Sequence, residues 1–276
     1  MMLGAIYQTK DHSTVLPGTE RIRVRLLGPI AVVINGAQHS VPGLRRRAIL
    51  SVLAMHSGRV VSVDKIIDVV WGGNAPVTAI NALQSHVSYL RRHYNAGGAI
   101  TACSSGYVLD LQGGLTDLQM VEQLIGQARE LDDPTAAAHL LRAALAVWRG
   151  PSLADVVDLC WFDNQAGRLE RMRHTAVKSL AEAQLALGEH ALIVPDLEDL
   201  ADQHPFDEQI HGQLMLALYR AGRQVDALAV YRGLRDRLRR ELGVDPMPML
   251  RNLELAVLRQ DTALAMRPHG TLSCSQ

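Results

Sequence analysis

One amphipathic segment carries the side chains that are best suited to chemistry in this chain. Residues 74–94 read NAPVTAINALQSHVSYLRRHY, and we predict a single helix there. Helical spacing gathers one polar set, with Gln84 and Tyr89 on its flanks: Thr78, Asn81, Gln84, Ser85, Ser88, Tyr89, Arg91 and Arg92. Amides and hydroxyls match the hydrogen-bonding edges of bases in the major groove, and arginines bind phosphates. A solvated helix face is the alternative interpretation, and this segment alone does not separate the two.

The opposite side of the same segment predicts burial. Ile80, Leu83, Val87 and Leu90 recur at i, i+3, i+7 and i+10, which places them on one apolar stripe. We expect this stripe to pack against other elements of a small domain, so that the polar side faces outward.

Charge is divided unevenly along the chain. The formal net charge is zero, yet residues 21–113 hold ten Lys and Arg against three Asp and Glu, a net +7 that the remainder must balance. A basic first region points to a polyanionic partner. Arg45, Arg46 and Arg47 fall in the first turn of a helix that we expect over residues 44–55, where positive charge opposes the helix dipole. A phosphate backbone, solvent or a nearby carboxylate could compensate for them.

The elements around this segment predict a small α+β domain. Residues 21–33 alternate charged and apolar side chains as one strand does, and a turn at Asn35-Gly36 leads to a short strand near residues 38–41. Ser62 caps a second helix that ends at Gly72-Gly73, and Pro76 starts the third. So short a connection between two helices is typical of a helix-turn-helix pair.

A hairpin is predicted after this helix pair. Its two arms lie around Ser104-Ser105-Gly106, and it completes a winged helix whose tip suits a groove of DNA but equally suits any tight turn. We assign Ser105 and Tyr107 to this wing, with the domain core as the alternative for Tyr107.

The second half predicts helices only. We expect them near 116–131, 134–149, 165–187, 190–203, 207–221, 223–241 and 247–264. A weak internal repeat aligns Gly188 with Gly222, 34 residues apart, which is the period of tetratricopeptide helix pairs. Several large side chains at helical spacing are predicted core residues: Trp148, Trp161, Leu185, Leu216, Tyr219 and Tyr231.

Other function classes find little support. Cys103, Cys160 and Cys274 are far apart and lack the spacing of a zinc or redox site, which fits a reducing cytoplasm. Residues 1–20 hold no signal-peptide pattern and are expected to form a flexible tail, and no stretch is apolar enough to span a membrane. Catalytic motifs and phosphate-binding loops are absent from the sequence, so we expect no enzyme, catalytic residue, cofactor or metal.

Several motifs in order resemble one family of regulators. RRRAILSVLAMHSGRVVSVDKIIDVVWGGNAPVTAINALQSHVSYLRR and GYVLDL resemble an OmpR-type winged helix. LLRAALAVWRGPSLAD, RLERMRHTAVKSLAEAQLALGEH and HPFDEQIHGQLMLALYRAGRQVDALAVYRGLRDRLRRELGVDP resemble the bacterial transcriptional activator domain. Together they are similar to the small, stand-alone class of the Streptomyces antibiotic regulatory protein family. The resemblance implies a DNA-binding domain at 21–113, a tetratricopeptide-like activator domain at 116–265 and a C-terminal tail at 266–276.

The resemblance also implies a function and partners. Family members bind direct repeats of double-stranded promoter DNA near the −35 element and recruit RNA polymerase holoenzyme, including its sigma factor, to secondary-metabolite genes. We therefore expect a transcriptional activator that forms a homodimer on DNA, associated with the nucleoid in the cytoplasm. A repressor or architectural protein that occupies a promoter without recruiting polymerase is the alternative, and a scaffold that binds protein through its winged helix is a third interpretation.

Residue roles follow from the same resemblance. The helix from Pro76 enters the major groove, so Asn81, Gln84, Ser85 and Ser88 are expected to contact bases, with Thr78 at the groove edge. Where this chain has Ser88-Tyr89, family members often have serine and then arginine, so Tyr89 could contact either a base or a phosphate. The residues expected at phosphates are Arg45, Arg46, Arg47, Trp71, Arg91 and Arg92; a packed position is the alternative for Trp71.

Overall fold

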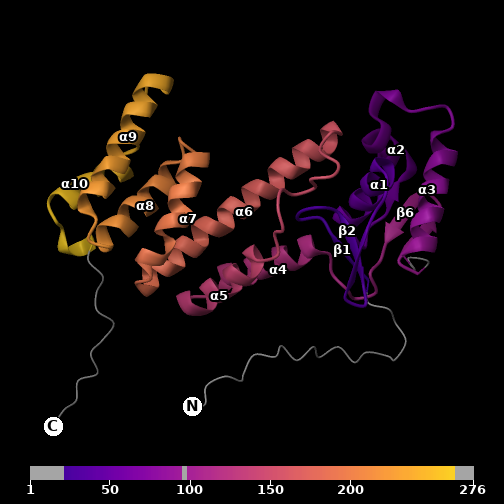
Figure 1. Cartoon of the computed structure of the whole chain (residues 1–276), viewed down its shortest axis with the longest axis horizontal. Helices are drawn as coiled ribbons and strands as arrows, with labels where there is room; N and C mark the ends of the chain where they lie inside the picture. Colours follow the sequence, from indigo (N-terminus) through magenta and orange to yellow (C-terminus); the bar gives the residue numbers. More distant parts are fainter. Residues whose placement is uncertain (1–21, 95–97, 265–276) are drawn as a thin grey trace, which may run out of the picture. The chain divides into compact units, whose positions relative to one another are not determined.

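A computed structural model describes residues 22–94 and 98–264 of the chain (Figure 1). These residues form two compact units, the first made of residues 22–26, 30–94 and 98–116 and the second of 27–29 and 117–264. The first unit combines small sheets with three helices, and the second is helical. The predicted fold class, an α+β winged helix followed by an all-α domain, is confirmed. The two predicted tails lie outside the described residues.

The first unit opens with a three-stranded antiparallel sheet. Its strands β1 (Ile22–Arg25), β2 (Ala31–Ile34) and β3 (Ala37–Ser40) pair in sequence order. The prediction of one strand over 21–33 was wrong, because the chain turns back at Gly28, whose φ of 136° suits glycine. Leu26 and Ile30 on either side of this turn are buried, so the apolar pattern hid the break. The predicted turn at Asn35-Gly36 is confirmed, with φ of 50° and 88°.

Three helices follow in the first unit, α1 (Leu44–Met55), α2 (Val63–Trp71) and α3 (Ala79–His93), and a 3₁₀ turn, η1 (Gly72–Asn74), follows α2 (Figure 1). The Ser62 hydroxyl accepts from Lys65 N (3.2 Å), which confirms the predicted cap of α2. The third helix begins later than predicted, since Ala79 N donates to Pro76 O (2.9 Å) in a turn and Ala82 N donates to Thr78 O. The helix therefore starts after Thr78.

The buried stripe of α3 differs from the predicted one at a single position. Ala79, Leu83, Val87 and Leu90 are buried, whereas Ile80 is 53% exposed. Spacings of four, four and three residues keep the buried set on one line, and Ile80 is rotated by about 100° from Ala79. The side chain of Ile80 therefore faces solvent at the first turn of the helix.

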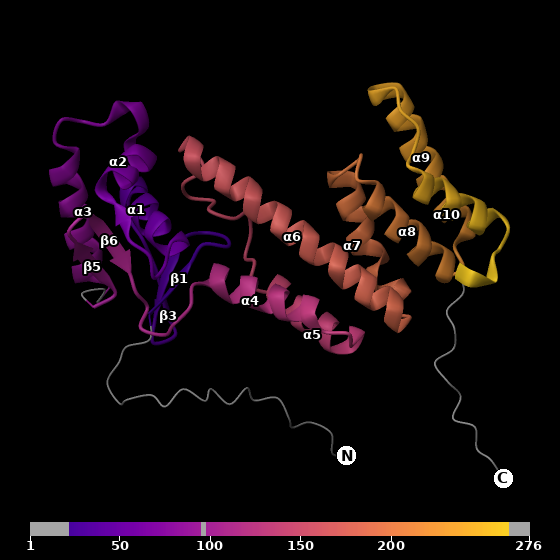
Figure 2. The same ribbon diagram turned by 180° about the vertical axis from the view of Figure 1, so that it is seen from behind.

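A second sheet forms the predicted wing. Strands β4 (Val61–Ser62), β5 (Ile100–Cys103) and β6 (Gly106–Leu109) pair in the order β4-β6-β5, with Ser104-Ser105 as the turn (Figure 2). Gly106 lies opposite Ser62, and a Cβ at Gly106 would come 1.9 Å from Val61 O. Only glycine therefore permits β6 to approach β4 so closely.

The second unit is a succession of helices, each packed on its neighbour in sequence (Figures 1 and 2). Their bounds are α4 (Asp117–Glu130), α5 (Pro134–Leu145), α6 (Cys160–Leu187), α7 (His190–Gln203), α8 (Glu208–Arg220), α9 (Gln224–Leu242) and α10 (Pro248–Leu258), followed by the 3₁₀ turn η2 (Thr262–Leu264). Residues 27–29 belong to this unit, because Leu27 N donates to Asp117 Oδ2 (3.0 Å) and Arg149 N donates to Leu27 O (2.9 Å).

Three predicted helix ends in this unit were wrong. Helix α10 stops at Leu258 instead of 264, because Gln260 adopts a left-handed φ of 52° and Asp261 N donates to Ala256 O (2.9 Å). Helix α5 tightens after Leu145 through Val147 N donating to Ala144 O (3.1 Å), and α6 begins at Cys160, five residues earlier than predicted. No Gly or Pro marks the end of α10, so the sequence carried no signal for it.

The predicted internal repeat is confirmed by two equivalent helix ends. Gly188 and Gly222 both adopt a left-handed φ, 81° and 78°. The following residues close the helices with the same bond, Glu189 N to Gln184 O (2.9 Å) and Arg223 N to Leu218 O (2.8 Å). This is the Schellman arrangement. The pairs α6–α7 and α8–α9 are therefore the repeated units of a helical stack.

Half of the six predicted core residues of this unit are buried. Trp148, Leu185 and Tyr231 are buried, which confirms their prediction. Trp161, Leu216 and Tyr219 are only partly buried, and the last two pack against the core formed by α6–α10. None of the described helices is both long and apolar enough to cross a membrane.

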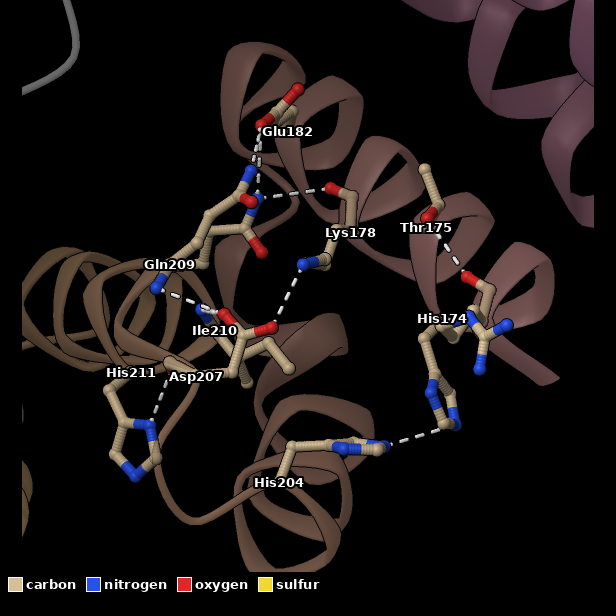
Figure 3. A network of polar contacts seen from close by, with 11 residues as sticks. His174, Thr175, Lys178, Glu182, His204, Asp207, Gln209, Ile210 and His211 are labelled. Atoms are coloured by element: carbon tan, nitrogen blue, oxygen red, sulfur yellow. Dashed lines mark hydrogen bonds and ion pairs between the residues drawn. The ribbon is translucent and has the colours of Figure 1, made fainter. Parts of the chain in front are cut away.

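Polar side chains connect α6 to the α7–α8 region (Figure 3). Lys178 Nζ donates to Asp207 Oδ2 (2.9 Å), and His174 Nε2 lies 3.2 Å from His204 Nε2. Burial raises the pKa of the Asp207 carboxyl, but hydrogen bonds from Lys178 and from Ile210 N outweigh it and lower the pKa overall. Asp207 also caps α8 by accepting from Gln209 N and Ile210 N. One carboxylate thus joins α6 to the start of α8.

Candidate nucleic-acid interface

The polar face of α3 is open to solvent. Thr78, Asn81, Gln84, Ser85, Ser88 and Arg92 are all exposed, and Tyr89 and Arg91 are half-buried at its edges. This face exists because the buried stripe of α3 occupies the opposite side and holds the helix against the rest of the unit. The structure therefore brings the predicted base-facing residues together on one surface.

The hydrogen-bonding groups of this face are largely uncommitted. Ser85 Oγ donates to Asn81 O within the helix (2.9 Å). Within residues 22–94 and 98–264, the side chains of Asn81, Gln84 and Ser88 make no hydrogen bond. An exposed amide or hydroxyl in this state can exchange water for a base edge at little cost.

The arginines of α1 rest on aromatic rings. The guanidinium carbon of Arg45 lies 5.4 Å from the centre of the Trp71 ring, and that of Arg46 lies 3.6 Å from the centre of the Tyr89 ring. Cation–π attraction of this kind contributes about 0.5–2 kcal/mol and leaves the positive charge in place. Two aromatic rings thus lie against these arginines, and a net positive charge remains at the start of α1.

The two aromatic rings also stack on histidines of α3. Tyr89 and His93 lie with their ring centres 3.6 Å apart and nearly parallel, and Trp71 stacks on His86 at 6.4 Å. Burial, then the positive charges of Arg46 and Arg45, lower the pKa of His86 below its usual value. A pKa below the usual 6.5 leaves the His86 imidazole mainly uncharged at pH 7.

The remaining predicted residues have differing positions. Arg91 Nε donates to Ile100 O (2.8 Å), which ties α3 to the wing strand β5, whereas Arg92 is exposed. Ser105 is exposed at the wing tip, and its carbonyl accepts from Val63 N (3.2 Å). Tyr107 is 9% exposed and pairs with Val61, so it lies in the core of the domain. Trp71 is half-buried beneath Arg45.

Sequence reasoning missed the residues that build this surface through long-range contacts. His86 and His93 were not singled out, and the pairing of Arg45 with Trp71 and of Arg46 with Tyr89 was not foreseen. The only available signal was the presence of aromatic residues on both helices that follow the arginine cluster. The presence of these aromatic residues does not show which arginine contacts which ring, because the angles at which α1 crosses α2 and α3 decide that.

Comparisons with known proteins match both units. Residues 43–109 match the family described as transcriptional regulatory protein, C terminal, and residues 116–258 match the bacterial transcriptional activator domain. Regulatory protein DnrI of Streptomyces peucetius is 32% identical over 256 residues, which cover 88% of this chain and 94% of DnrI. Transcriptional regulator RedD of Streptomyces coelicolor is 35% identical over 255 residues, 88% of this chain and 72% of RedD. The chain belongs to the Streptomyces antibiotic regulatory protein family.

A solved structure agrees with this assignment. The Mycobacterium tuberculosis protein EmbR, solved in complex with a low-affinity phosphopeptide, matches with a TM-score of 0.83 and 32% identity. The match covers 88% of this chain and 66% of that chain. As a member of the Streptomyces antibiotic regulatory protein family, this chain regulates transcription by binding DNA.

Proposed function

We propose that this protein is a transcriptional activator that binds direct repeats near the −35 element and recruits RNA polymerase holoenzyme, including its sigma factor. The observation that carries the proposal is the exposed polar face of α3, flanked by arginines, in a chain that also contains a bacterial transcriptional activator domain. Direct repeats place two copies side by side in one orientation, so the protein is a homodimer on DNA. It acts within the nucleoid on genes of secondary metabolism.

In this proposal the DNA-binding domain spans residues 21–113 and the activator domain residues 116–265. Asn81, Gln84, Ser85 and Ser88 contact base edges, and Thr78 lies at the groove edge. Arg45, Arg46, Arg47 and Arg92 contact phosphates on either side. About eight phosphate contacts, a number typical of this binding mode, make affinity fall by about three to five decades between low and moderate salt.

The deciding experiment is DNase footprinting on promoters beside the gene, with and without polymerase holoenzyme, followed by transcription from the same templates. An activator protects tandem repeats next to the −35 element, holoenzyme extends the protected region, and transcript increases. Protection that excludes polymerase makes the protein a repressor. Absence of protection at low salt contradicts DNA recognition by α3 and favours a protein-binding scaffold.

A further inference from the structure

Two apolar side chains at the start of the polar face of α3 are not buried in the core of the first unit. Val77 is fully exposed, and Ile80 is 53% exposed. They are two of the three exposed large apolar residues in the described part of the first unit; the third, Val60, lies on the α1–β4 connection. Single exposed apolar residues are ordinary on protein surfaces. These two differ because they lie three residues apart at the start of one functional face.

Their position continues the polar face of α3. Val77 lies in the turn that precedes the helix, and Ile80 lies in its first turn, beside Asn81. Helical geometry places Ile80 and Gln84, four residues apart, along one edge of this face, and Val77 precedes them in the turn. The N-terminal end of α3 therefore presents the methyl groups of Val77 and Ile80 next to the amide of Asn81.

The major groove contains one apolar feature that can match them. Each A·T pair presents the C5-methyl group of thymine beside the hydrogen-bonding atoms of adenine, and no other natural base of unmodified DNA presents a methyl there. Burial of exposed methyl groups against each other is favourable in water. The asparagine next to them can bond adenine N6 and N7 with its amide.

We propose that Val77 and Ile80 contact thymine methyl groups and so select A·T pairs at the part of the site that faces the start of α3. This inference rests on the proposed function, because it requires α3 to lie in the major groove. It assigns two specificity residues that the polar pattern of the sequence does not include. Asn81 reads the adenine of the same pair or of its neighbour.

The test replaces thymine by deoxyuridine, which removes only the methyl group and keeps the base pair. The probe is the duplex protected in footprinting, with each thymine of one repeat replaced in turn. We expect one or two positions at which affinity falls about fourfold for each methyl lost, from the value of a buried methyl group. The double variant V77A/I80A should bind the thymine site more weakly and lose its preference for thymine over deoxyuridine at those positions.

The control is Val60→Ala, which also shortens an exposed valine of the same unit but lies outside α3. It should keep both the affinity and the deoxyuridine effect. Specific binding with no loss at any deoxyuridine overturns the inference and leaves the proposed function intact. A deoxyuridine effect that persists in V77A/I80A assigns the contact to other residues and also overturns it. Absence of any specific binding instead contradicts the proposed function.

Discussion

The two units of this chain use their arginines in opposite ways. In the helical unit, arginines pair with carboxylates, as in Arg142 with Glu189, Arg223 with Asp226 and Arg239 with Asp245. In the described part of the winged-helix unit, no Lys or Arg forms an ion pair with Asp or Glu, and Arg45 and Arg46 lie on aromatic rings instead. Arginines of the helical unit thus have carboxylate partners, whereas Arg45 and Arg46 of the winged-helix unit face aromatic rings.

The formal charge of the sequence also differs along the chain, since residues 21–113 carry +7 and the remainder carries −7. Unpaired positive charges in one small domain repel each other and reduce its stability, unless a polyanion binds there. Exposed ion pairs such as those of the helical unit contribute little energy, typically below about 1 kcal/mol, but in each pair the carboxylate offsets the local positive field of the arginine. Arginines without carboxylate partners, Arg45 and Arg46, therefore lie in the unit that we propose binds DNA.

The strongest way to break this comparison is to remove three arginines from each unit. The variant R45A/R46A/R47A should lose about three decades in DNA affinity, at roughly 1.5 kcal/mol for each charged contact. The slope of log affinity against log salt should fall by about three. The matched variant R235A/R239A/R240A removes the same charge from α9 and should leave both values unchanged. Binding isotherms at several salt concentrations measure this, and equal losses in the two variants would refute the division.

Glycine substitutions compare the packing of the two units. Gly106→Ala should destabilise the winged-helix unit by about 3 kcal/mol, because its Cβ would overlap the backbone at Val61. Gly126→Ala in α4, where a Cβ meets nothing within 4 Å, should stabilise the helical unit by about 0.5–1 kcal/mol. Hydrogen exchange localises each effect to its unit. Unchanged stability of the Gly106→Ala variant would show that β4 and β6 can move apart with no loss of free energy of unfolding, and would contradict the prediction.

Single substitutions on α3 sharpen the assignment of roles within the first unit. Arg92→Ala should weaken binding to specific and random DNA alike, because a phosphate contact carries no sequence information. Asn81→Ala should instead relax preference at one base step by about 1–3 kcal/mol. Competition binding with single-base variants of the repeat measures both. Equal losses on specific and random DNA for the two variants would contradict this division of labour.

The smallest expected effect concerns pH and the helical unit. His211 is buried and its Nδ1 lies 2.9 Å from Asp207 O; burial lowers the pKa of its imidazole below the usual 6.5 (Figure 3). Burial, and then His204, lower the pKa of His174 in the same way. The unfolded chain then binds more protons than the folded chain, so stability present above pH 6.5 is lost as the pH falls below it.

Hydrogen exchange in α8 at pH 7.5 and 5.5, corrected for intrinsic rates, measures this loss of stability.

In the winged-helix unit the pKa of His86 is also lowered, partly by Arg46 and Arg45. Bound DNA should therefore raise the pKa of His86 in NMR titrations and leave that of His211 unchanged. The same change at both histidines would contradict the assignment of DNA to the first unit.

Local sequence patterns predicted much of this fold. The cap at Ser62, the turn at Asn35-Gly36, the wing turn at Ser104-Ser105 and the repeated ends at Gly188 and Gly222 are all as predicted. Each depends on a few consecutive residues whose conformational preferences are strong. The break between β1 and β2 and the end of α10 at Leu258 were missed, because buried apolar residues continue through the first and no glycine marks the second.

The sequence by itself determined the fold class, the repeat and the polar face of α3, since these follow from periodicity and from turn residues close together in the chain. Only the tertiary structure decided that Ile80 is exposed, that Arg46 lies on Tyr89, and that Arg91 holds Ile100. These facts depend on how far each neighbouring element reaches and on the angle at which helices cross. Such geometry arises from the packing of the whole unit, and no local pattern encodes it.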